Sequence, residues 1–204
     1  MGKFSESVSG WFSKDNRPVD EDILRKGVVW DAAGQMQSCI FCDYATHAKE
    51  QEILFEDDLV AAFHPRKQSA KQHILVIPKR HISTVGDLVP GDVAVLERMK
   101  VVATQLLKCD ASNTQLSFHI PPWNSIDHLH LHAFETPFLS WWHGLRFSEG
   151  KPWCASFERV KIWAAGGDAV VEAQTPPFDK EEKEDIEEAQ PTHPHKDEEE
   201  EEEK

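Results

Sequence analysis

Three histidines alternate with two leucines near the middle of the chain, in the stretch "DHLHLHAF". Successive side chains on a β-strand point to opposite faces, so a strand here would place His128, His130 and His132 on one face and Leu129 and Leu131 on the other. Near neutral pH an imidazole can act as a nucleophile, a hydrogen-bond partner or a metal ligand. The stretch therefore predicts a site for a phosphate or a metal ion, on a strand whose opposite face packs into the core.

Two other interpretations of these histidines stay open at this point. In the first, one histidine is structural and the other two occur by chance, although strict alternation with apolar residues argues against this. In the second, the three imidazoles ligate one metal ion, since strand neighbours two residues apart can share an ion.

The pair of cysteines in "CIFC" is a second chemical signal. Cys39 and Cys42 have a spacing at which two thiolates can bind one zinc ion, and a tetrahedral site would need two more ligands. His47 is one candidate by its proximity in the sequence, and the alternative is a half-buried pair of thiols in a turn. Cys109 and Cys154 are expected to be packing thiols.

The surrounding patterns predict the elements that position these residues. Apolar residues recur with a period of about 3.6 over 93–107, which predicts the main helix. Short apolar runs bounded by turn residues predict strands. These strands are a pair around a Glu-Asp-Asp turn within 52–65, a buried strand over 73–77 that ends at Pro78, and two further strands over 114–120 and 127–134.

The composition divides the chain into three parts. Residues 1–35 are expected to form a loosely ordered arm with one short helix that Asp20 would cap, and residues 36–165 the folded domain. Residues 166–204 are expected to be a disordered tail. From Asp179 onward 14 acidic residues face four lysines, so this end carries −10 of the net charge of −14. Residues 138–165, which contain four tryptophans, are expected to fold back over the sheet.

The same composition excludes several classes of protein. No stretch approaches the roughly 18 apolar residues of a membrane span, and the start "MGKFSESVSG" lacks the apolar core of a signal peptide. The mildly acidic domain does not favour generic binding to nucleic acid or to membranes. A cytoplasmic protein, with the nucleus as a further location, is expected.

Four segments together resemble the histidine triad nucleotide-binding family, in content and in order: "CIFC", "HILVIPKRH", the predicted helix and "FHIPPWNSIDHLHLH". The resemblance covers about residues 39–135, with a looser continuation to about 165. The last segment is most similar to the Hint3-type branch of adenosine phosphoramidases, and it shares features with aprataxin, a DNA deadenylase. The resemblance implies an α+β fold with a mostly antiparallel sheet of about five strands and one long helix, often in a homodimer.

The resemblance also implies a reaction. Members release a nucleoside monophosphate, here AMP, from phosphoramidate or acyl-adenylate substrates through a covalent nucleotidyl-histidine. By position, His130 matches the nucleophile, His132 and His73 would hold the phosphate oxygens, and Ser125 would assist the leaving group. His132 also favours hydrolysis, because transferases of the superfamily often carry glutamine at that position.

Other site residues are determined less sharply by the resemblance. His119 stands where many members have asparagine, so it would either bind phosphate or serve the strand alone. His64 lies near the position of an acidic residue that binds the ribose in relatives. Trp123, with Trp141 and Trp142, would line the nucleotide or leaving-group pocket, with packing in the core or in a dimer as the alternative.

Zinc-bearing members of the family suggest the two missing metal ligands. They match His81, which closes "PKRH", and His128, the first histidine of the triad. Together with Cys39 and Cys42 these residues would form a closed Cys2His2 site, which is structural because no position is left for water.

Two alternatives to a phosphoramidase are retained. One is an aprataxin-like hydrolase that removes AMP from 5′-adenylated DNA, although a zinc finger of the kind typical of that branch has no counterpart in this sequence. The other is a nucleotide-binding module without catalytic activity, against which the complete histidine triad argues.

Overall fold

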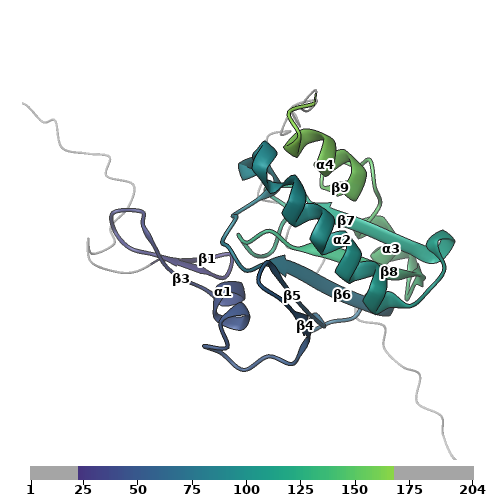
Figure 1. Cartoon of the computed structure of the whole chain (residues 1–204), viewed down its shortest axis with the longest axis horizontal. Helices are drawn as coiled ribbons and strands as arrows, with labels where there is room; N and C mark the ends of the chain where they lie inside the picture. The colour runs from purple at the N-terminus through teal and green to yellow at the C-terminus, as the bar shows by residue number, and fades with distance from the viewer. Residues whose placement is uncertain (1–22, 168–204) are drawn as a thin grey trace, which may run out of the picture. The chain divides into compact units, whose positions relative to one another are not determined.

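The computed structural model describes residues 23–167, which form an α+β fold with two antiparallel sheets (Figure 1). The smaller sheet has the order β1-β2-β3 and the larger one the order β4-β5-β6-β8-β7-β9. The predicted fold class is confirmed, but the main sheet has six strands rather than about five. The strands are β1 (Ile23–Arg25), β2 (Val28–Trp30), β3 (Met36–Cys39), β4 (Ile53–Glu56), β5 (Val60–Phe63), β6 (Ala70–Pro78), β7 (Thr114–His119), β8 (Leu131–Phe138) and β9 (Cys154–Ser156).

Four α-helices accompany the sheets, and the helix predicted from the 3.6-residue period is confirmed as α2. Short 3-10 turns over Val85–Asp87, Pro90–Asp92 and Ala111–Asn113 connect the elements. Within the described part of the chain, none of the helices combines the length and the apolar character needed to cross a bilayer. The helices are α1 (Ile40–Ala45), α2 (Val93–Leu107), α3 (Trp141–Arg146) and α4 (Phe157–Ala164).

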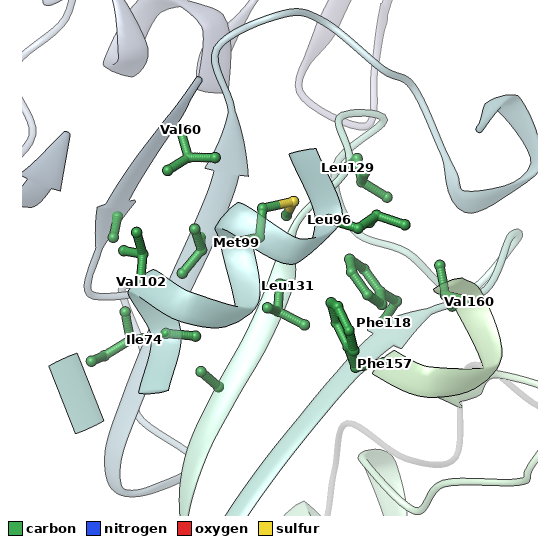
Figure 2. Close-up of a cluster of buried hydrophobic side chains, with 14 of the residues drawn as sticks. Val60, Ile74, Leu96, Met99, Val102, Phe118, Leu129, Leu131, Phe157 and Val160 are labelled. Atoms are coloured by element: carbon green, nitrogen blue, oxygen red, sulfur yellow. The ribbon is translucent and has the colours of Figure 1, made fainter. Parts of the chain in front are cut away.

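The main hydrophobic core lies between the large sheet and helices α2 and α4 (Figures 1 and 2). Leu96 and Met99 of α2 are fully buried and belong to one cluster with Ile74 and Leu131 of the sheet. Phe157 of α4 lies beside Phe118 of β7, with 6.4 Å between the ring centroids. This packing holds the centre of the sheet, where β8 lies between β6 and β7.

The predicted division of the triad stretch between two faces is confirmed. Leu129, Leu131 and Ala133 all belong to the main core. In the sheet register His132 pairs with Leu75, a member of the second, smaller core on the other face. Because directly paired residues of antiparallel strands share a face, His132 points away from α2.

The expected extent of the triad strand is wrong. β8 begins only at Leu131, so His128 and His130 precede the strand. The Leu129 amide donates to the carbonyl of Ile82 rather than to a ladder partner in β7. This local departure lets successive histidine rings turn toward different partners, which a regular strand would not allow.

The short helix expected in the N-terminal arm is also wrong over the described residues. Residues 23–30 form the hairpin of β1 and β2, because Lys26 and Gly27 adopt positive φ values of 46° and 69°. Two such residues make the tight turn that suits a two-residue hairpin. The rest of the arm, residues 1–22, and all but the first two residues of the expected tail lie outside the described residues.

Of the four tryptophans, Trp163 packs against the main core, whereas Trp141 and Trp142 do not cover the sheet. Trp141 and Trp142 are 66% and 62% exposed on α3. Instead, phenylalanines of the same region are buried: Phe147 follows α3 and Phe157 begins α4. The prediction that this segment returns to the sheet is confirmed through these residues.

Replacing Leu96 with alanine should destabilise the protein, because Leu96 is fully buried between α2 and the sheet. The expected loss is about 2–5 kcal/mol in the free energy of unfolding, measured by urea denaturation. Val101→Ala on the same helix is the control, since Val101 is 40% exposed. Equal losses for the two variants would contradict the assignment of this helix face to the core.

Candidate active site and metal centre

His130 is buried and lies just before the first residue of β8, and one of its two ring nitrogens makes a hydrogen bond. Its Nδ1 lies 2.6 Å from the carbonyl oxygen of His128, so Nδ1–H donates and Nε2 keeps its lone pair. Burial lowers the pKa of His130 to about 4, which leaves the ring neutral at pH 7. A neutral imidazole with a fixed tautomer and a free Nε2 is equipped to act as a nucleophile.

His132 and His73 form a buried pair beside His130. His132 Nδ1 lies 3.0 Å from His73 Nε2, across the β6–β8 pairing. Burial, followed by the charge of Arg146, lowers the pKa of His73 to about 3, and burial also holds the pKa of His132 well below its usual value. The remaining nitrogens, His132 Nε2 and His73 Nδ1, are buried without a hydrogen-bond partner among the described residues.

His119 of β7 completes a cluster of imidazoles around His132. The two ring centroids are 4.9 Å apart, and His119 Nε2 lies 3.4 Å from the carbonyl oxygen of Arg146. Burial lowers the pKa of His119 to about 4. One ring nitrogen from each of His119, His130 and His132 lies within 4.8 Å of the others. The interpretation in which His128, His130 and His132 share one metal is therefore wrong, because His128 does not belong to this group.

Three phenylalanines enclose these histidines, and the sequence analysis did not identify Phe134 or Phe147 as part of the site. Phe147 lies with its centroid 4.9 Å from those of both His119 and His132. Phe134 lies 4.3 Å from His73 by the same measure. Phe41 meets His130 edge-on at 5.5 Å, and only its place inside "CIFC" links it to the site. This apolar enclosure causes the desolvation that keeps the imidazoles neutral.

His128 belongs to a second group, with Cys39, Cys42 and His81. Ligand atoms of all four residues lie within 4.8 Å of one another. Nδ1 of His128 is 3.4 Å from Cys39 Sγ, and Nδ1 of His81 is 3.4 Å from Cys42 Sγ. The structure thus brings together the four residues that the resemblance indicated.

The donor set of this group fits a zinc ion. His128 Nε2 donates to the carbonyl oxygen of Pro78 at 2.9 Å, and His81 Nε2 lies 3.2 Å from Ser83 Oγ. Outer partners of this kind orient metal-bound imidazoles, and they leave both Nδ1 atoms directed at the sulfurs. The hydrogen bond from the Cys42 thiol lowers the pKa of Cys39, which favours a thiolate there.

His47 is excluded as the third ligand of this group. It is exposed, and its Nε2 lies 3.2 Å from a carboxylate oxygen of Glu56. Cys154 behaves as a packing thiol, as predicted: it is fully buried, and burial raises its pKa to about 11. Cys109 lies 3.3 Å from Thr114 Oγ1, also apart from the metal group.

The other predicted site residues lie outside the buried cluster. Ser125 is exposed on the loop between β7 and β8. Trp123 of the same loop is 36% exposed, with its ring 6.5 Å from that of Trp153. His64 is exposed and donates from Nδ1 to the main-chain oxygen of His73 at 3.1 Å. Trp141 and Trp142 stack on each other with centroids 3.7 Å apart.

The chain was compared with known protein families and proteins. A family model described as "Scavenger mRNA decapping enzyme C-term binding" matches residues 38–146. The chain is 40% identical over 124 residues to the bifunctional adenosine 5′-phosphosulfate phosphorylase/adenylylsulfatase HINT4 of Arabidopsis thaliana, which covers 59% of this chain and 85% of the relative. It is 36% identical over 112 residues to the adenosine 5′-monophosphoramidase HINT3 of Xenopus tropicalis, with 50% and 73% covered.

Solved structures with similar folds were also found. A HIT family hydrolase from Legionella pneumophila Philadelphia 1 matches with 28% sequence identity and a TM-score of 0.47. This match covers 51% of the present chain and 97% of the solved one.

The neutral buried histidines predict that the protein loses stability in acid. An unfolded histidine binds a proton below about pH 6.5, whereas His73, His119, His130 and His132 bind theirs only at much lower pH. The contribution of these neutral rings to the free energy of unfolding is complete above pH 6.5 and is lost as the pH falls toward 4. The free energy of unfolding should fall by up to about 1.4 kcal/mol per pH unit for each such histidine.

The measurement is urea denaturation between pH 7 and pH 4. His119→Gln should reduce the slope by one histidine's share, while Val101→Ala, which alters an exposed side chain and removes no titratable group, should leave it unchanged. Both variants keep Cys39, Cys42, His81 and His128 unchanged. Any effect of this group on the pH dependence of unfolding is therefore common to both. An unaltered slope in His119→Gln would contradict the neutral state of that ring.

Proposed function

We propose that this chain, which belongs to the histidine triad (HIT) family, hydrolyses adenylyl conjugates to AMP through a covalent intermediate on His130. The observation that carries the proposal is the free Nε2 of His130, on a neutral buried ring whose Nδ1 is occupied by the His128 carbonyl. The substrate class comes from the relatives, whose names record adenosine phosphoramidate and adenosine 5′-phosphosulfate activities.

The first step forms the nucleotidyl-histidine. His130 Nε2 attacks the α-phosphorus, an N–P bond forms, and the bond from phosphorus to the leaving group breaks. The electron pair leaves with that group, and a departing amine takes up a proton from a solvent water. The Ser125 hydroxyl is the proposed partner of this group, and the exposed position of Ser125 at the loop suits contact with a substrate.

Hydrogen bonds to the phosphate oxygens would stabilise charge in the transition state. If His132 Nδ1 accepts from His73 Nε2–H, a proton remains on His132 Nε2, the buried atom without a partner. That N–H could donate to a phosphate oxygen. The low pKa values favour this neutral, donating form over the cationic one for His132 and His73 in the site without substrate.

The second step restores the enzyme. Water attacks the same phosphorus, the N–P bond breaks, and its electron pair returns to Nε2 while the water proton leaves with the solvent or the phosphate. His119 is the proposed further phosphate contact, since it lies beside both His130 and His132. His64 and Trp123 stay proposed contacts to the nucleoside, which their exposure permits.

We also propose that Cys39, Cys42, His81 and His128 hold a structural zinc ion. Zinc would supply coordination that joins α1 to the chain entering β8, and it would take no part in the reaction. The convergence of two sulfurs with two Nδ1 atoms supports this assignment. A homodimer and a cytoplasmic or nuclear location stay predictions.

The covalent step can be tested with adenosine 5′-phosphoramidate carrying ³²P at its phosphate. Base denaturation preserves phosphohistidine, so the native protein should retain label after a rapid quench while His130→Ala retains none. His130→Ala should also lower kcat by at least about 10³-fold, because it removes the nucleophile. His47→Ala, which alters an exposed histidine paired with Glu56, should label and turn over like the native protein.

Other outcomes are informative. Label that persists in His130→Ala would contradict the role of His130. Binding of AMP without any turnover of phosphoramidate, phosphosulfate or acyl-adenylate would favour a binding module. Faster turnover of 5′-adenylated DNA than of these small conjugates would favour the aprataxin-like alternative.

The metal proposal predicts a loss of zinc from Cys39→Ser. Native protein should carry about one zinc per chain by mass spectrometry of the intact protein and by elemental analysis. Cys39→Ser should lose it and melt at a lower temperature, with activity per folded molecule reduced less than zinc content. Cys109→Ser, outside the group, should keep its zinc, and an unchanged metal content in Cys39→Ser would rule out the proposed site.

A further inference from the structure

The turn of the N-terminal hairpin lies against the loop that leads into the triad. Asp127 N donates to the carbonyl oxygen of Lys26 at 2.9 Å, and Ile40 N donates to that of Gly27 at 3.0 Å. Gly27 suits this approach, because its φ of 69° is one that other residues rarely adopt and a Cβ there would lie 2.6 Å from Ile126 Cδ1 and 2.9 Å from Ile40 Cγ2. The turn therefore contacts both the segment before His128 and the start of α1.

The Lys26 side chain makes three further contacts with the same loop. Its Nζ donates to the carbonyl oxygen of Pro122 at 2.9 Å and to Asn124 Oδ1 at 2.8 Å. It also lies 3.7 Å from Asp127 Oδ1. One ammonium group thus connects both ends of the segment 122–127.

The residues that Lys26 contacts are polar and buried. Asn124 is 5% exposed and Asp127 is 8% exposed. Asn124 Nδ2 donates to Asp127 Oδ1 at 2.8 Å and to the Ile126 carbonyl at 3.0 Å. A carboxylate with so little contact with water needs a nearby cation, and Lys26 is nearer than Arg25, whose Nε lies 4.0 Å from the carboxylate.

This network adjoins two groups that the proposed reaction uses. Ser125 lies between Asn124 and Asp127 in the chain. Asp127 is followed by His128, whose carbonyl oxygen holds the Nδ1 proton of His130. A shift of the loop would displace both the Ser125 hydroxyl and this carbonyl.

The backbone conformation of Lys26 also indicates that this residue does more than form the turn. Its φ of 46° lies in the left-handed region, where asparagine and glycine are the favoured residues of a two-residue hairpin turn. A side chain with a Cβ costs roughly 1–2 kcal/mol there. The lysine is therefore not the residue that the turn alone would favour, while its ammonium group makes the contacts described above.

We propose that Lys26 is a positioning residue for the reaction, which holds the loop 122–127 through Asn124 and Asp127 so that Ser125 and the His128 carbonyl are aligned with the substrate and with His130. The inference rests on the proposed function. It concerns a residue outside the triad segment, in a hairpin that precedes the metal-binding cysteines in the chain.

The first test compares Lys26→Met, which retains length and removes charge, with Lys26→Arg, which retains both. With adenosine 5′-phosphoramidate as substrate, Lys26→Met should lower kcat by about 10- to 100-fold with little change in KM, because the reacting groups are misplaced. Lys26→Arg should restore most of kcat. The matched control is Lys108→Met, since Lys108 is an exposed lysine with a φ of 51° at the end of α2.

A double-mutant cycle tests whether Lys26 affects kcat through the loop 122–127. If Lys26 acts through the loop, the fold-loss of kcat caused by Lys26→Met should be smaller in a Ser125→Ala background than in the native protein, because only the effect on the His128 carbonyl remains, whereas independent sites give additive losses. Additive losses would overturn the proposal, and so would a native kcat in Lys26→Met. If Lys26→Met does not fold, Lys26→Gln, which also lacks the charge, takes its place in the cycle.

Amide hydrogen exchange keeps this inference separate from the proposed function. Lys26→Met should speed exchange at the amides of Asp127 and Leu129, and Lys108→Met should not. If native protein turns over none of the adenylyl substrates, the proposed function fails, and the exchange rates still test whether Lys26 holds the loop. Equal exchange in the native protein and in Lys26→Met would overturn the positioning role on its own.

Discussion

The arrangement of both sites depends on how His128 is held. Its Nε2 donates to the carbonyl of Pro78, which directs Nδ1 at the two cysteine sulfurs. Its own carbonyl accepts the Nδ1 proton of His130, which leaves His130 Nε2 free. The hydrogen bonds of His128 therefore orient its own ring, which is a candidate metal ligand, and the ring of His130, which is the candidate nucleophile.

Desolvation sets the chemistry of the buried imidazoles. Phe134 and Phe147 surround His73, His119 and His132, and the low pKa values of these histidines follow from the loss of water. Buried polar atoms without partners are costly in a folded protein. His132 Nε2 and His73 Nδ1 are such atoms among the described residues, and a bound phosphate would supply an acceptor for one of them. The site thus carries unsatisfied hydrogen-bonding capacity where a nucleotide phosphate would sit.

The core on the opposite face supplies the rigidity that such a site needs. Leu129 and Leu131 anchor the triad segment under α2, so each histidine backbone is held by buried neighbours. In the loop that precedes the triad, Ile126 packs against the second core, and polar contacts, among them those of Lys26 to Pro122, Asn124 and Asp127, hold the rest. Apolar packing therefore holds the strand, while one apolar side chain, hydrogen bonds and the ion pairs of Asp127 with Lys26 and Arg25 hold the loop.

The sequence by itself determined the main helix and the opposite faces of leucine and histidine in the triad, and, through a family resemblance, the α+β class and the candidate residues of each site. These follow from local periodicity and from short motifs, which the chain carries within a few residues. Tertiary structure alone decided that His119 joins His130 and His132, that Phe147 closes the histidine cluster, that the first described residues form a hairpin, and that Lys26 reaches Asn124. Each of these is a contact between segments far apart in the chain or a backbone turn held by such contacts, and local patterns do not encode which distant surfaces will meet.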